Sequence, residues 1–255
     1  MQELAMNPEM LTNEERAQLI VDFFHRNMVH HALWYSEVKH QMGEEKGLEY
    51  LAQASRKSYE IQMRHLSKLL GFEMVDNVPA PLLTMSTEEQ MALLDRVAKN
   101  WLVSDGVWFQ TVEFAEGMND AKRCNDSCWA QFSPVEAASI KNMLGLDKKP
   151  GLEGLKRALG FRMYGTINEQ SIRDEKEESF IFQMDKCRVQ AARNRKGLED
   201  YPCKSAGLVE YTYFARAIDS RITTECIGCP PDEHPKEWYC AWKFSLPRAE
   251  NDNEE

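Results

Sequence analysis

The chain has 255 residues, a length that fits one large domain or two ordinary ones. Its 31 basic and 41 acidic residues give a formal net charge of −10, which argues against a nucleic-acid-binding surface over the whole chain. No stretch approaches the roughly 18 consecutive apolar residues of a membrane span. The segment Met1–Met6 lacks the basic and apolar regions of a signal peptide. We therefore expect a cytoplasmic protein without a membrane or nucleic-acid partner.

The first 145 residues have the pattern of long helices. Thr12 and Glu15 form a capping box, in which each side chain accepts a hydrogen bond from the other residue's backbone. Gly43 is placed to end this first helix. A second helix is expected from Glu45 to Leu70, ending at Gly71.

The same pattern returns 74 residues later. Residues 12–71 align without a gap on residues 86–145, with nine identities that include Trp34 with Trp108. We interpret this as two repeated helical hairpins, joined by the linker Asn77–Pro81, that pack as a pseudo-symmetric bundle. The prediction places Trp34 and Trp108 in equivalent buried positions, with no strand before residue 145.

The pattern changes after Gly145 to strands mixed with separate helices, which predicts an α+β fold. The whole chain is therefore expected to divide into three regions: a helical repeat bundle over 1–147, a cysteine-rich α+β domain over 148–248 and an acidic tail over 249–255. Helices are expected up to Gly160 and over 187–197 and 206–218, and strands over 161–168, 179–184, 221–226 and 238–246.

Two polar residues, His31 and Asp105, fall at matching positions on the apolar stripes of the two hairpins. Both should be buried with polar partners, because an unpaired buried polar group is costly. They form either a structural pair or a catalytic or metal-binding centre to which Glu37 and Glu113 add carboxylates. Cys124 and Cys128 lie on one helical face, where core packing is favoured over half of a metal site.

Cysteines gather in the last third of the chain. Cys226 and Cys229 form a C-x2-C pair, and Cys240 follows ten residues later. Thiolates at this spacing are typical of a tetrahedral zinc site, and a single such pair favours zinc over an iron–sulfur cluster. The fourth ligand is expected to be Cys203, with Cys187 and His234 as alternatives; otherwise these thiols are core residues of strands.

Cys187 begins a predicted helix, with Arg188, Arg193 and Arg195 close in sequence. A thiol at a helix N-terminus beside cations has a lowered pKa, which favours a nucleophile. Cys203, followed by Lys204, has a similar setting.

The order of strand, Cys187 helix, Cys203 loop, helix and a final strand at Cys240–Phe244 resembles the L-2-amino-thiazoline-4-carboxylate hydrolase family over residues 160–246. The same segment is similar to 4-vinyl reductase-type ligand-binding domains. Nearly the whole chain resembles uncharacterised prokaryotic proteins described only as cytosolic. The resemblance implies a small α+β domain with a pocket. Similarity to the ligand-binding domains, which bacterial aromatic sensors share, implies a zinc bound by Cys226 and Cys240, a pattern from which the extra Cys229 departs. Similarity to the hydrolases implies catalysis at Cys187.

The cysteine pattern predicts a metal-binding protein, and the resemblance implies a hydrolase-type enzyme acting on a small cyclic amidine-like or sulfur-containing substrate. Its candidate catalytic residues are Cys187, His31 and Asp105, and its candidate zinc ligands are Cys203, Cys226, Cys229 and Cys240. The alternatives are a sensor module that binds a small ligand beside a structural zinc, and a scaffold that uses the bundle for assembly. The sequence leaves a homo-oligomer open.

Overall fold

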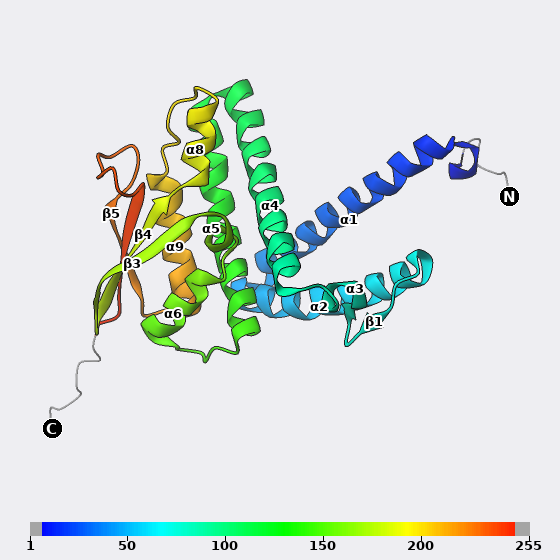
Figure 1. Cartoon of the computed structure of the whole chain (residues 1–255), viewed down its shortest axis with the longest axis horizontal. Helices are drawn as coiled ribbons and strands as arrows, with labels where there is room; N and C mark the ends of the chain where they lie inside the picture. The colour runs from blue at the N-terminus through cyan, green and yellow to red at the C-terminus, as the bar shows by residue number, and fades with distance from the viewer. Residues whose placement is uncertain (1–6, 248–255) are drawn as a thin grey trace. The chain divides into compact units, whose positions relative to one another are not determined.

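The computed structural model describes residues 7–247 (Figure 1). The chain forms two compact units, Met1–Ala80 and Pro81–Glu255. The predictions for Met1–Met6 and for the acidic tail from Ala249 to Glu255 lie outside the described residues. Within residues 7–247 no helix is long and apolar enough to cross a membrane.

The first unit is a helical hairpin. After a short 3-10 helix, η1 (Pro8–Met10), come α1 (Asn13–Met42) and α2 (Glu44–Leu70). The predicted capping box is confirmed: Glu15 N donates to Thr12 Oγ1 at 3.2 Å, and Thr12 N donates to Glu15 Oε2 at 2.8 Å. Gly43 separates the helices at φ 89°, and Gly71 ends α2 in the left-handed region at φ 75°.

This hairpin has almost no core of its own. Gly47 is the one buried residue of α1 and α2. Trp34 is 62% exposed, so its predicted burial is wrong. A pair of helices buries only the stripe between them, and the outer face of α1 has no further element of its unit to cover it. Residues 74–79, which include the start of the predicted linker, form a short antiparallel ribbon of β1 (Met74–Val75) and β2 (Val78–Pro79), against the expectation of no strand before residue 145.

The second unit begins with another helical hairpin. The short α3 (Ala80–Leu83) precedes α4 (Thr87–Glu116) and α5 (Met118–Leu144). Ser86 and Glu89 form the predicted second capping box, and Gly117 and Gly145 follow the helices as expected. Trp108 is 72% exposed, so its predicted burial is also wrong. That the two hairpins pack as one pseudo-symmetric bundle stays a prediction.

The C-terminal part is an α+β arrangement, as the sequence predicts. Its elements are α6 (Gly151–Gly160), α7 (Met163–Ile167), β3 (Glu169–Lys176), β4 (Ser179–Lys186), α8 (Arg188–Arg195), α9 (Lys204–Ile218), β5 (Thr223–Gly228) and β6 (Cys240–Ser245). The four strands form an antiparallel sheet in the order β3-β4-β6-β5.

One predicted strand is wrong. Residues 161–168 alternate in polarity, yet most of them form α7. Tertiary packing overrides the alternation, because the helical turn places the Tyr164 ring against Trp101 and Trp129 at centroid distances of 4.9 and 5.7 Å. The strand begins afterwards, at Glu169.

The core lies between the sheet and the helices. Alternate residues of β4, Phe180, Phe182 and Met184, are buried, which is the period of a strand with one covered face. Helix α9 packs on β5 and on α5 (Figure 1). The helices α4 and α5 therefore belong to the same compact unit as the sheet, and the unit boundary falls at Ala80 rather than at the predicted residue 147.

Candidate functional site: a cavity beside a group of thiols

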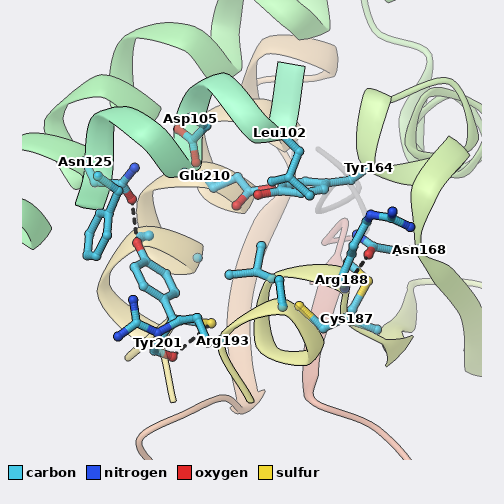
Figure 2. Close-up of a pocket in the computed structure, with 18 of the residues that line it drawn as sticks. Leu102, Asp105, Asn125, Tyr164, Asn168, Cys187, Arg188, Arg193, Tyr201 and Glu210 are labelled. Atoms are coloured by element: carbon cyan, nitrogen blue, oxygen red, sulfur yellow. Dashed lines mark hydrogen bonds between the residues drawn. The ribbon is translucent and has the colours of Figure 1, made fainter. Parts of the chain in front are cut away.

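A cavity of about 380 Å³ lies within the second unit, where α4, α5, α8 and α9 meet the sheet (Figure 2). Its walls are largely apolar, with polar groups at separate points, which is the usual composition of a small-molecule site. The polar groups discussed below come from six elements or their ends and from the loop between α8 and α9: Asp105, Asn125, Asn168, Cys187, Tyr201, Glu210 and Trp242.

Acidic groups and a tyrosine form one side of the cavity. Figure 2 shows Asp105, Glu210 and Tyr164 close together there. Burial raises the pKa of Glu210, although its Oε1 lies 2.7 Å from the guanidinium of Arg162. Burial also raises the pKa of Asp105. Carboxyls in this setting retain protons more readily than exposed ones.

Tyr201 forms the opposite side and is fixed by several contacts. Its hydroxyl donates to Asn125 Oδ1 and accepts from Lys122 Nζ at 2.8 Å. The Gln190 side chain binds the backbone of Tyr201 twice, accepting from its N–H at 2.9 Å and donating to its carbonyl at 2.8 Å. Arg193, on the same helix as Gln190, makes a two-pronged ion pair with Glu113 of α4 at 2.9 and 3.1 Å. This wall is therefore rigidly held.

Two buried N–H donors in the cavity wall lack acceptors. Asn168 Nδ2 and Trp242 Nε1 have no hydrogen-bond partner within the described chain. The other side of the Asn168 amide is used, since its Oδ1 accepts from Arg188 N at 2.8 Å and so satisfies the start of α8. A buried donor without an acceptor is costly, and a ligand oxygen or nitrogen would remove that cost.

Cys187 lines the cavity at the start of α8, as the sequence predicts, but not as a thiolate. Burial is the largest effect, and together with the neighbouring thiols Cys203 and Cys240 it raises the pKa of Cys187 to about 12. The backbone N–H groups of Gln190 and Val189, at the helix N-terminus, lower the pKa of Cys187 as expected, but this effect is smaller than that of burial. The prediction of a lowered pKa is wrong because desolvation outweighs the dipole.

Three of the four predicted zinc ligands meet at the base of the cavity. Hydrogen bonds with Cys203 and Cys240, followed by burial, raise the pKa of Cys229. Cys226 lies on β5 opposite Trp242 of β6, and its pKa is raised by burial and by Cys240. In the part of the chain that the structure describes, no group of three or more His, Cys, Asp or Glu side chains has the arrangement of a metal site. All seven cysteines are free thiols.

The remaining candidates are not all at this cavity. His31, in the first unit, is exposed, and its Nε2 lies 3.2 Å from Ser55 Oγ, so its predicted burial is wrong. Asp105 is half-buried and lines the cavity. Cys124 and Cys128 are exposed, against the expectation of core packing. His234 Nδ1 lies 2.9 Å from the Pro235 carbonyl oxygen.

Sequence reasoning missed Tyr164, Asn168, Glu210 and Trp242. One signal was available for Glu210: it lies on the buried stripe of α9 formed by Gly207, Tyr211 and Phe214, where an acid is unusual. Tyr164 and Asn168 were hidden by the wrong strand assignment.

The comparisons with known proteins identify one family. A family of unknown function, DUF6125, matches residues 83–246, which is more than half of the chain and includes every residue that lines the cavity. Neither a curated protein nor a solved structure gives a match. The chain belongs to the DUF6125 family.

Proposed function

We propose that the second unit binds a small, mainly apolar molecule in the cavity between α4, α5, α8, α9 and the sheet. The observation that carries this proposal is the pair of unpartnered N–H donors, on Asn168 and Trp242, in the wall of a cavity of about 380 Å³. A ligand with hydrogen-bond acceptors would pair those donors, and its apolar part would cover the rest of the wall.

Basic side chains favour an anionic group on that ligand. Lys99, Arg188, Arg195 and Lys196 are among the lining residues. Lys99 is paired with Asp95, and Lys196 donates to Gln110 at 3.2 Å. Within the described chain no ion pair is found for Arg188 or Arg195, and Arg188 is exposed beside Cys187. A carboxylate or sulfonate near α8 would therefore meet a favourable charge.

A dye-binding experiment tests the cavity. The probe is 1-anilino-8-naphthalenesulfonate, an aromatic anion with sulfonate acceptors, titrated into the full-length protein. The variant Ala192→Phe fills the cavity from α8, and Ala191→Phe places the same ring on a neighbouring position that does not line it. We expect at least a tenfold loss of dye affinity in the first variant and less than a twofold change in the second. Wild-type affinity in Ala192→Phe would refute the proposal.

We also propose a zinc ion at Cys203, Cys229 and Cys240, with Cys226 as the fourth ligand. The contacts of Cys229 with both other thiols support it, because thiolates that share a zinc lie within about 4 Å of one another. A zinc with four thiolates would be structural, joining the start of α9 to the ends of β5 and β6. Elemental analysis of tag-free protein should give one zinc per chain. The zinc should be lost in Cys229→Ser and kept in Cys124→Ser. Less than 0.1 zinc per wild-type chain would refute the site.

The hydrolase alternative rests on Cys187 as a nucleophile. Its raised pKa leaves the thiol protonated at neutral pH, so a nearby base would have to take the proton. The raised pKa of Cys187 therefore supports the ligand-binding function more than catalysis by this thiol.

A further inference from the structure

A second cavity, of about 180 Å³, lies in the groove between α4 and α5. It is separate from the main cavity, although Asp105 and Trp129 border both. Trp101, Ser104, Asp105 and Trp108 are spaced by three, four and seven residues, so α4 presents them on one face. Helix α5 supplies the opposite wall with Cys128, Trp129 and Phe132.

Aromatic rings make up most of these walls. Trp101 meets Trp129 edge-on at a centroid distance of 5.9 Å and stacks with Phe132 at 6.2 Å. Trp129 meets Phe132 edge-on at 5.7 Å. Trp108 is 72% exposed and forms the open side. The negative faces of such rings attract cations, and tryptophan does so most strongly.

Asp105 is the acidic group of this cavity and lacks a counter-ion. It lies one helical turn from Trp101 on one side and from Trp108 on the other. Within residues 7–247 it has no hydrogen bond and no ion pair, and burial raises its pKa. A desolvated carboxylate without a partner is costly to the folded protein. A cation seated between the rings would offset that cost.

We propose that this cavity binds a small organic ammonium ion, with its methyl or methylene groups on the tryptophan faces and Asp105 as the counter-ion. One carboxylate and the Ser104 hydroxyl are too few oxygen ligands for a divalent metal ion. A neutral ligand would leave the carboxylate unpaired. The inference concerns a separate cavity and does not rest on the function proposed above.

Calorimetric titration of the full-length protein with choline tests the proposal. The neutral isostere 3,3-dimethyl-1-butanol has the same shape without the charge, and we expect it to bind at least about tenfold more weakly. Asp105→Asn and Trp108→Leu should each weaken choline binding at least about fivefold. Asp95→Asn removes another carboxylate of α4 that does not line the cavity and should change the affinity less than twofold.

A further variant separates this site from the main cavity. Ala192→Phe fills the main cavity and should leave choline affinity within twofold of wild type. Circular dichroism confirms the fold of each variant, and the exposed Trp108 is a position where substitution leaves the core intact. The proposal is overturned if the wild type shows no choline binding at 50 mM or if the isostere binds equally.

It is also overturned if Asp105→Asn binds choline like the wild type, or if Ala192→Phe abolishes binding while Trp108→Leu does not. The last result would place the ammonium ion in the main cavity.

Discussion

Cys187 precedes α8 and is followed by Arg188, a position along the chain that favours a thiolate, but its surroundings favour the neutral thiol. Burial removes the water that would solvate the negative charge, and Cys203 is too close for both sulfurs to ionise easily. The backbone N–H groups of the helix offset only part of this effect.

The raised pKa predicts slow alkylation. At pH 7.5 the exposed Cys124 should react with iodoacetamide much faster than Cys187, whose pKa of about 12 leaves a very small thiolate fraction. The rate at Cys187 should rise about tenfold per pH unit from pH 7 to 9, since the thiolate is the nucleophile. Peptide mapping by mass spectrometry measures both rates, and equal modification at pH 7.5 would contradict the assignment.

The pKa of Asp219 is lowered, whereas that of Cys187 is raised. Hydrogen bonds from the Arg221 side chain, at 2.7 and 3.0 Å, lower the pKa of Asp219 to about 2, and the backbone N–H groups of Arg221 and Gly151 add to the effect. The carboxylate thereby joins the end of α9 to the start of α6. A lowered folded-state pKa stabilises the protein above the unfolded value, and this stability is lost as the pH falls.

Asp219→Asn should therefore destabilise the protein at pH 7 by about 2 kcal/mol, the free energy that corresponds to a shift from 3.8 to about 2. The difference from wild type should shrink as the pH falls from about 5 towards 2. Urea unfolding at a series of pH values measures it. A difference that stays constant over this range would show that the charge of Asp219 is not the cause.

At the scale of the elements, Arg162 joins two helices through one buried guanidinium. It is 1% exposed, and its Nε donates to Glu136 of α5 at 2.8 Å while a terminal nitrogen lies 2.7 Å from Glu210 of α9. Glu136 also accepts from the Met163 backbone N–H at 3.1 Å, which fixes the start of α7. The arginine therefore holds α7, and with it Tyr164, against the wall of the cavity.

Arg162→Met should cost about 3–5 kcal/mol, because two buried carboxylates lose their cation. The exposed Arg157 of α6 gives a matched control, and Arg157→Met should change the free energy of unfolding by less than about 0.5 kcal/mol. Adding Glu210→Gln to Arg162→Met should recover part of the loss, since one unpaired charge disappears. Denaturant unfolding measures the stability of all three variants. Equal stability of Arg162→Met and Arg157→Met would refute the role of the ion pairs.

At the scale of the whole molecule, the two units differ in how much they bury. Nearly every residue of α1 and α2 is accessible, whereas α9 has seven buried residues. Helices without tertiary packing are marginally stable in water. We expect backbone amides of α1 to exchange with deuterium at least tenfold faster than those of α9 in the intact protein. Equal protection would contradict the expectation that α1 is only marginally stable.

The sequence by itself determined the local features of this protein. Thr12 and Ser86 start α1 and α4, and Gly43 and Gly117 end them, because capping and a positive φ depend on a few neighbouring residues. The strands β4, β5 and β6 follow the alternation of apolar residues. It also predicted that Cys203, Cys229 and Cys240 lie close together, and Cys229 contacts both other thiols.

Only the tertiary structure decided which faces are buried and how charged groups ionise. Trp34 and Trp108 lie on apolar stripes that their own units do not cover, a fact that periodicity cannot show. The α7 turn follows from the packing of Tyr164 against Trp101 and Trp129, which lie on two other helices. The neutral thiol of Cys187 depends on desolvation by residues distant in the chain. The local rule for a helix N-terminus therefore predicted a lowered pKa where the pKa is raised.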